Sequence, residues 1–243
     1  WRWPHGSMNI LESTLIGGSN ALLLTGDDSY LDLHRSQWDA LWALGEERDG
    51  AFQTPNRHGD VGWFDYRAPN VRYPLHLYCL TRKPADRARM ERCGPLSTRG
   101  GFSKGGQYTP FAWFDLVDGG NAGAADEMLD ATYQEMCRRL ALIRDDDGDP
   151  AEWDVHHWQN LNPVVCEPLA QLTTGSPGAI YHGGLLHAAV RYFDPEAQRP
   201  GLPEGVSALV GRVSDDAITV HLANTNLLEA REVLLQAGAF GEH

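Results

Sequence analysis

The sequence lacks an apolar run long enough to cross a lipid bilayer. Its longest apolar runs, 21–24 and 40–44, are broken within a few residues, whereas a membrane-spanning helix needs about 20 apolar residues. Basic residues are also scarce: 20 lysines and arginines stand against 33 aspartates and glutamates, which gives a formal net charge of −13. Nucleic acids and anionic bilayers require a basic surface, so we expect neither a nucleic-acid partner nor a membrane partner.

Cofactor and metal motifs are missing as well. The four cysteines, Cys79, Cys93, Cys137 and Cys166, form no CxxC pair, so we interpret them as buried thiols, which leaves the redox compartment open. The glycine-rich stretch 100–106 has neither the GxxxxGK[ST] order nor the GxGxxG order of phosphate-binding loops. We therefore expect no cofactor and no metal.

The composition is that of a globular protein, with 42% hydrophobic and 22% charged residues. The chain begins at Trp1 and stops at His243, directly after an expected strand. Both ends therefore look cut, and we expect a fragment that assembles with the remainder of its own polypeptide or with a companion chain. A signal peptide that lay in a missing N-terminal part would not be visible, so localisation stays unknown.

Helical periodicity dominates the first 198 residues. Apolar side chains at helical spacing predict helices over 7–24 and 30–44, joined as a hairpin by the turn 25–28. Gly17-Gly18 inside the first of these indicates either a close helix–helix approach or a break. Further helices are predicted over 75–80, 85–92, 110–117, 124–143, 164–172 and 180–193.

Two stretches interrupt this pattern. Residues 45–75 are rich in aromatic residues, proline and glycine, and we interpret them as a long irregular loop, which is typical of a functional segment. The proline-rich stretch 195–205 reads as a linker, after which the period changes to two, predicting a meander of three strands ending near Ala237. The predicted fold class is mainly α, with a helical domain over 1–198 and the start of an antiparallel β domain over 199–243.

The first candidate site lies in the predicted loop, between positions 56 and 67. Glycine-punctuated loops often carry binding and catalytic groups, and aromatic faces beside carboxylates suit the apolar faces and hydroxyls of a sugar. The alternative is a loop held together by Arg–Asp pairs and aromatic packing. The candidates are the possible acid/base groups Asp60 and Asp65 and the possible substrate-binding residues His58, Trp63, Tyr66 and Arg67.

The second candidate site is the polar and aromatic stretch 152–160. Asp154 and His156 are candidate acid/base groups, and Trp158 and Asn160 are candidate substrate-binding residues. The pair His156-His157 has neither HxH nor HExxH spacing, which argues against a metal site. A polar wall without chemistry is the alternative.

Three further residues extend the candidate set. Tyr181 and His182 begin the helix predicted after a Ser-Pro-Gly turn, where they either project into a site or form a tight helix entry. Glu167 stands in an apolar segment, as a second carboxylate, a helix cap or a member of a structural ion pair.

One motif resembles a known architecture. Residues 21–33, Ala-Leu-Leu-Leu-Thr-Gly-Asp-Asp-Ser-Tyr-Leu-Asp-Leu, lead to Trp38 and then to Asp49-Gly50. They resemble the repeat of (α/α) toroid enzymes, in which a helix ends in a Thr-Gly-Asp turn and the next begins with Tyr-Leu. Many glycoside hydrolases and polysaccharide lyases share that architecture, often with a C-terminal β-sandwich domain. The resemblance implies helical hairpins of a partial toroid followed by a β domain.

The resemblance, taken with the candidate residues, implies a carbohydrate-active enzyme that degrades an oligo- or polysaccharide. We expect a glycoside hydrolase in which Asp60 or Asp65 acts with Asp154, one protonating the leaving oxygen and the other activating water. The first alternative is a polysaccharide lyase acting on uronate-containing glycans. In a lyase, His58 or His156 would act with Tyr66 or Tyr181 as base and acid. Arg57 or Arg67 would neutralise the uronate. The second alternative is a non-catalytic glycan-binding or scaffold segment.

Overall fold

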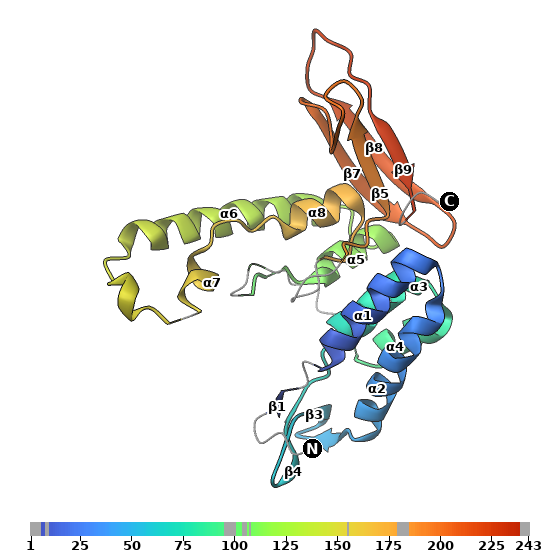
Figure 1. Ribbon diagram of the computed structural model, residues 1–243, viewed down its shortest axis with the longest axis vertical. Helices are drawn as coiled ribbons and strands as arrows, with labels where there is room; N and C mark the ends of the chain where they lie inside the picture. Colours follow the sequence, from blue (N-terminus) through green and yellow to red (C-terminus); the bar gives the residue numbers. More distant parts are fainter. Residues whose placement is uncertain are drawn as a thin grey trace. The chain divides into compact units, whose positions relative to one another are not determined.

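The chain divides into two compact units, each of which is described by itself (Figure 1). The computed structural model describes residues 6–7, 10–94, 101–103, 106, 108–154, 156–178 and 185–238. Unit 1 comprises Trp1–Leu96 and Ile180–Leu185, and unit 2 comprises Ser97–Ala179 and Leu186–His243. The chain is 44% helix and 22% strand, with the strands in several small antiparallel sheets. The predicted mainly-α class is therefore wrong, and the fold class is mixed α/β.

Unit 1 begins with the predicted helical hairpin, which is confirmed. Helix α1 (Ile10–Thr25) is followed by a 3₁₀ turn (Asp28–Leu31) and by α2 (Asp32–Ala43). The carboxylate of Asp27 accepts the backbone N–H of Ser29 at 2.9 Å and so caps the turn. Leu15 of α1, Leu31 of the 3₁₀ turn and Trp38 of α2 are buried in this part of the unit.

The paired glycines of α1 have different surroundings. A Cβ on Gly18 would lie 2.7 Å from the carbonyl oxygen of Tyr30, whereas a Cβ on Gly17 would meet nothing within 4 Å. The glycine pair therefore marks a close approach of α1 to the 3₁₀ turn rather than a helix break.

These surroundings predict opposite effects of two neighbouring substitutions. Gly18→Ala should lower the free energy of unfolding by about 1–3 kcal/mol, because the added methyl group overpacks the contact with Tyr30. Gly17→Ala should raise it by up to about 1 kcal/mol, because alanine favours the helix and has open space here. Urea denaturation followed by circular dichroism measures both, and equal effects of the two changes would contradict the close approach.

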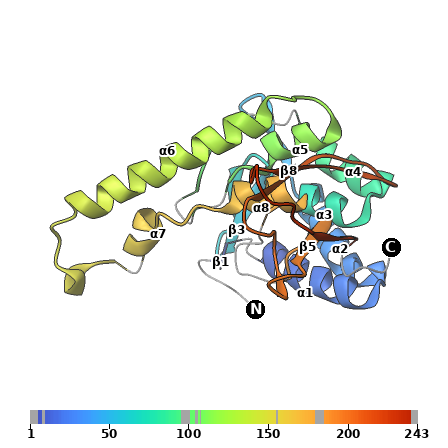
Figure 2. The ribbon, with the colours of Figure 1, turned by 90° about the horizontal axis from the view of Figure 1, so that it is seen from above.

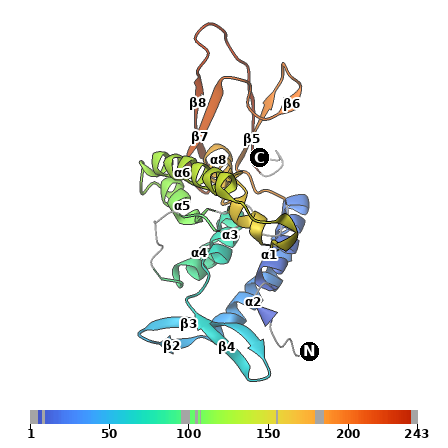
Figure 3. The same cartoon turned by 90° about the vertical axis from the view of Figure 1, so that its left-hand side faces the viewer.

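The stretch 45–75, expected to be an irregular loop, forms most of a small sheet instead. Strands β2 (Glu46–Arg48) and β4 (Gly62–Arg67) both pair antiparallel with β3 (Ala51–Gly59), and β1 (Gly6–Ser7) adds a short fourth strand (Figure 3). Helices α3 (Arg72–Thr81) and α4 (Pro84–Glu91) follow.

Cross-strand pairs explain why this stretch is a sheet. His58 lies opposite Trp63, Arg57 opposite Phe64, and Pro55 opposite Tyr66, and such aromatic pairs stabilise antiparallel strands. The chain reverses at Gly59-Asp60-Val61-Gly62, where Gly62 has a φ of 83°. Gly59 and Gly62 therefore mark the turn of a hairpin, and Pro55 occupies a position within its first strand.

A buried carboxylate connects three helical segments of unit 1. The side chain of Asp86, at the start of α4, is 1% exposed. It accepts hydrogen bonds from Arg35 on α2 at 3.0 and 3.2 Å, from Arg89 at 2.8 Å and from the Thr81 hydroxyl at 2.7 Å. Burial alone would lower the pKa of Arg35, but its hydrogen bonds to Asp86 and to two further aspartates raise that pKa. Arg35 therefore stays charged against the buried carboxylate.

Unit 2 is built around its long helix. This helix, α6 (Ala124–Asp145), follows α5 (Pro110–Asp118) and precedes α7 (His157–Leu161) and α8 (Glu167–Thr174) (Figure 2). The predicted helices 110–117, 124–143 and 164–172 correspond to α5, α6 and α8, so they are confirmed apart from their ends.

A buried arginine holds the segments around α6 together. Arg139 is 1% exposed, and its guanidinium donates to the carbonyl oxygens of Ser103, Gln159 and Asn162 at 2.9–3.1 Å and to Glu135 at 2.6 Å. Hydrogen bonds from Arg138 lower the pKa of Glu135. Burial raises that pKa, but with the further hydrogen bond from Arg139 it falls to about 2. Glu135 is therefore a carboxylate at neutral pH beside the buried Arg139 guanidinium.

The strands of unit 2 pair differently from the predicted meander. Strands β7 (Val206–Val213) and β8 (Ile218–Asn224) form the expected hairpin, but β9 (Leu234–Ala237) pairs with β5 (Val190–Asp194). A short strand, β6 (Arg199–Pro200), pairs with the other edge of β5. The helix predicted over 180–193 is therefore wrong in its described part: 185–189 are not helical, and Val190, Tyr192 and Asp194 are buried in alternation, as in a strand.

These findings overturn the toroid resemblance. The hairpin that carries it exists, but the described strands form three small sheets, one within unit 1 and two within unit 2. A partial toroid followed by a β-sandwich domain would instead place helical hairpins first and the sheet residues after them. The motif at 21–33 is a local solution for joining two helices, and it does not extend into that architecture.

Two of the four thiols also differ from the expectation that all are buried. Cys79 is buried and Cys93 is partly buried, and burial raises the pKa of Cys93 to about 11. Cys137 on α6 and Cys166 just before α8 are exposed, and all four are free thiols.

Candidate functional site

The second candidate stretch forms an exposed aromatic cluster in unit 2, which we call the Trp153 cluster: residues Trp153, His157 and Trp158. The ring of Trp153 stacks on His157 with centroids 4.2 Å apart and meets Trp158 edge-on at 5.0 Å. Trp158 is 63% exposed. The cluster therefore presents an aromatic face to solvent on a support of packed rings.

The support of this cluster comes from the loop after α6. The Nε2 atom of His157 lies 2.6 Å from a carboxylate oxygen of Asp146. Hydrogen bonds from the backbone N–H of Gly148 and from His157 lower the pKa of Asp146. A Cβ on Gly148 would lie 2.8 Å from the Nε1 atom of Trp153. The close packing of Trp153 therefore favours glycine at position 148.

An ionisable pair lies beside these rings. The carboxylate of Asp154 lies 2.8 Å from the Nδ1 atom of His156 and accepts the backbone N–H of the same residue at 2.6 Å. Both side chains are exposed, as is Asn160. The structure thus brings Asp154 and His156 together, and it places Trp158 and Asn160 on the same short helix, α7. These groups offer hydrogen-bond donors and acceptors next to an aromatic face.

Arg139 fixes where this segment lies. Its guanidinium holds the carbonyl oxygens of Gln159 and Asn162, one within α7 and the other just after it. A helix of five residues is too short to be stable alone, so this clamp to α6 contributes to its position. The sequence gives no signal for this clamp, because an arginine inside a helix is ordinarily exposed.

The first candidate stretch is the β3–β4 hairpin of unit 1. Asp65 has a φ of 58°, and its carboxylate accepts hydrogen bonds from Asn56 at 3.0 Å and Arg67 at 2.9 Å and lies 3.3 Å from the Nε atom of Arg57. The hydrogen bond from Asn56, followed by that from Arg67, lowers the pKa of Asp65. A carboxylate with a lowered pKa is a poor proton donor at neutral pH, so this geometry favours a structural role for Asp65 over general-acid catalysis.

The other residues of the hairpin are also engaged with one another. The His58 and Trp63 rings meet edge-on with centroids 4.7 Å apart, and the guanidinium of Arg48 lies 3.6 Å from the centre of the Tyr66 ring. Asp60 is exposed in the turn. The structure therefore brings together Asp65 and Arg67, and separately His58 and Trp63, as the packing alternative expects. Asp60 and Asp65 belong to unit 1 and Asp154 to unit 2, so their pairing as two catalytic carboxylates stays a prediction.

Of the remaining candidates, Tyr181 and His182 lie outside the described residues. Glu167 is the first residue of α8, and its carboxylate accepts the backbone N–H of Tyr108. A Cβ on Gly178 would lie 2.4 Å from Glu167 Oε1, so the side chain is closely packed. This places Glu167 in a structural role that links α8 to the segment before α5.

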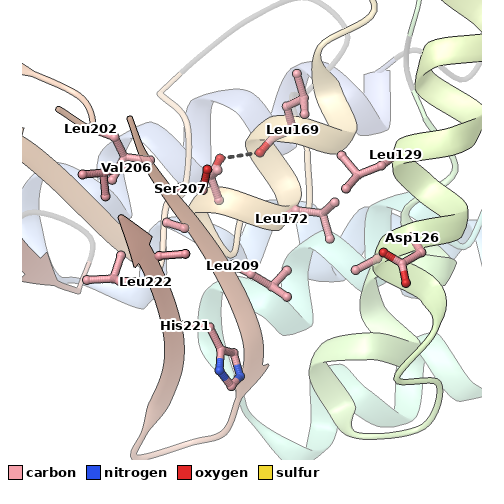
Figure 4. A pocket seen from close by; sticks show the side chains of 14 residues that line it. Asp126, Leu129, Leu169, Leu172, Leu202, Val206, Ser207, Leu209, His221 and Leu222 are labelled. Atoms are coloured by element: carbon pink, nitrogen blue, oxygen red, sulfur yellow. Dashed lines mark hydrogen bonds between the residues drawn. The ribbon is translucent and has the colours of Figure 1, made fainter. Parts of the chain in front are cut away.

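A cavity of about 470 Å³ in unit 2 was not foreseen from the sequence (Figure 4). Its walls are mostly apolar and come from α6, α8 and the β7–β8 hairpin, with Asp126, Ser207 and His221 as its polar side chains besides Thr173. Figure 4 shows Leu129 of α6 and Leu172 of α8 on facing walls. Helical periodicity places Leu129 on the apolar face of the helix predicted over 124–143. The contact between the β7–β8 hairpin and α8 joins segments far apart in the sequence, so the sequence does not predict the cavity.

Comparison with known proteins gives a family and no activity. A family model described as Domain of unknown function (DUF8034) matches residues 1–54 and 46–170. No curated protein and no solved structure matches the chain. Within the described residues, no helix has the length and apolar content to cross a membrane, and no three His, Cys, Asp or Glu side chains there come together as metal ligands.

Proposed function

The chain belongs to this DUF8034 family, and because membership brings no activity with it, we propose a function from the surface itself: the Trp153 cluster binds an oligo- or polysaccharide. The observation that carries the proposal is the exposed Trp158 ring, supported edge-on by Trp153. A flat aromatic side chain pre-positioned by its neighbours gives contact area at a low entropic cost. Buried aromatic residues that only fill a core would not present such a face.

The polar groups around Trp158 match the second requirement of a sugar, its belt of hydroxyls. Asp154 accepts hydrogen bonds, His156 donates or accepts according to its tautomer, and the Asn160 amide does both. All three are exposed within one short segment. The unit's anchor at Arg139 keeps that segment in place. The surface is therefore a preformed one rather than one that must order on binding.

Removing the exposed ring tests the proposal. Trp158→Ala should weaken binding of the best glycan in a panel of neutral and uronate-containing oligosaccharides by roughly 10-fold or more, because an aromatic residue at the centre of a binding site commonly contributes 2 kcal/mol or more. Isothermal titration calorimetry on the full chain measures the loss. Trp63→Ala, which removes an exposed tryptophan from the other candidate stretch, is the matched control and should leave binding unchanged.

The two variants separate the candidate stretches. A loss with Trp63→Ala and none with Trp158→Ala would move the site to the β3–β4 hairpin. Binding of no glycan by the unchanged chain would refute the proposal for both stretches.

Hydrolysis of the bound glycan is a second candidate function, favoured by one observation. Asp154 and His156 form an exposed carboxylate–imidazole pair 2.8 Å apart beside the proposed binding face, and such groups serve general acid–base chemistry. Release of reducing ends from polysaccharide, lost in Asp154→Asn with binding retained, is the expected result for a hydrolase. Unsaturated products that absorb ultraviolet light would indicate a lyase, and binding without any product leaves the glycan-binding function alone.

A further inference from the structure

The C-terminal two thirds of α6 carry an apolar stripe that the chain's own packing leaves exposed. Its members alternate in steps of four and three residues and are each 38–65% exposed; they are Leu129, which also lines the cavity of unit 2, and Tyr133, Met136, Leu140 and Ile143. Apolar residues every 3.5 positions on average form the seam of a two-stranded coiled coil. We call this set the α6 seam.

The two flanks of the α6 seam differ. On one flank, Thr132 and Arg139 are buried against the chain itself. On the other flank, Asp130, Cys137 and Arg144 each follow a seam residue directly, seven positions apart, and all three are exposed. Only the second flank is therefore available to a partner helix. Along it, the acidic Asp130 comes first, the neutral thiol of Cys137 lies in the middle, and the basic Arg144 comes last.

This order of charges points to a second copy as the occupant: we propose that α6 pairs antiparallel with α6 of a second copy of this chain. In an antiparallel coiled coil, each flank of the seam meets the same flank of the other helix. When Tyr133 packs on the partner's Ile143 and Leu140 on the partner's Met136, Asp130 lies opposite the partner's Arg144. Two-fold symmetry repeats that ion pair at the other end.

The same register has two further consequences. Cys137 lies midway between Asp130 and Arg144 in the sequence, so it lies opposite the partner's Cys137 near the two-fold axis. A parallel pairing would instead bring this flank against the partner's Thr132–Arg139 flank, which the chain itself buries, so neither Asp130–Arg144 ion pair would form. The charge order therefore selects the antiparallel arrangement, over a helix about 33 Å long for its 22 residues.

Sedimentation equilibrium and thiol cross-linking of the full chain test the pairing. We expect a concentration-dependent dimer that copper phenanthroline with dissolved oxygen converts to a disulfide-linked dimer, the oxidant taking the two electrons as two protons leave the thiols. Cys137→Ser should abolish the link. Cys166→Ser, which removes the other exposed thiol, should leave it intact. A monomer at all concentrations, or a link that depends on Cys166, would overturn the proposal in favour of an unlike partner on the seam.

Charge reversal tests the register. Asp130→Arg and Arg144→Asp should each raise the dimer dissociation constant roughly tenfold, because each creates two like-charge pairs at the symmetric interface. An equal mixture of the two variants should recover dimer formation, since the mixed dimer contains one ion pair of the original sign and one of reversed sign. That recovery shows that the variants are folded, and its absence, with circular dichroism unchanged, would contradict the register. Trp158→Ala should not affect any of these results, which separates them from the glycan proposal.

Discussion

Replacing Asp86 with alanine is expected to lower the free energy of unfolding of unit 1 by about 3–5 kcal/mol, because it removes the buried acceptor that Arg35, Arg89 and the Thr81 hydroxyl share. The ion pairs that remain, Arg35 with Asp28 and Asp32 and Arg89 with Asp39, involve more exposed carboxylates. Arg35 and Arg89 both direct hydrogen bonds at the Asp86 carboxylate, and the side chain of Asp86 is almost completely buried. Urea denaturation of the full chain measures the change, and hydrogen exchange read by mass spectrometry should place the loss of protection in α2, α3 and α4.

Asp32→Ala is the matched control for this change. Asp32 also pairs with Arg35, at 2.9 Å, but its side chain is largely exposed. Exposed ion pairs contribute about 0–1 kcal/mol, so the control should have little effect. If both variants lost the same free energy of unfolding, the burial of Asp86 would not explain its contribution to stability. The contribution would then come from its ion pair with Arg35, which Asp32 shares.

The parts of this fold that the sequence predicted are those set by local periodicity. The α1–α2 hairpin and α6 follow from apolar residues repeating on one helical face, and the β7–β8 hairpin follows from alternation around a short turn. Strand β5 was not predicted because its partner β9 lies about 40 residues away in the sequence, and no local pattern identifies a distant pairing partner. The β3–β4 hairpin was not predicted because glycines and a proline such as Pro55 are typical of irregular loops.

The candidate residues were predictable only as chemical types. The sequence placed Asp65 and Arg67 in one stretch and Asp154 and His156 in another, and the structure brings each pair into contact. The sequence alone does not show that Asn56 and Arg67 hydrogen-bond to Asp65 and lower its pKa, since those contacts depend on strand register. The α6 seam shows the reverse case. Its periodicity predicted the helix over 124–143, but periodicity identifies an apolar face without saying what covers it.

Replacing Arg139 with alanine should have an effect on unit 2 as large as that of the Asp86 change on unit 1, about 3–5 kcal/mol of unfolding free energy. The substitution leaves Glu135 without its buried partner and removes the donors that hold the carbonyl oxygens of Ser103, Gln159 and Asn162. Denaturation of the full chain measures it, with loss of exchange protection expected in α6 and α7. Lysine at this position should recover only part of the stability, because an ammonium group cannot reproduce the planar fork of donors.

Arg138→Ala is the matched control, one position away on the same helix. Arg138 also pairs with Glu135 but is largely exposed, so its loss should cost under about 1 kcal/mol. The pair of variants also links the fold to the proposed function. Because Arg139 holds carbonyl oxygens within α7 and just after it, Arg139→Ala should weaken glycan binding at Trp158 even where unit 2 remains folded, whereas Arg138→Ala should not. Glycan binding unaffected by Arg139→Ala would mean that the Trp153 cluster keeps its geometry without the clamp.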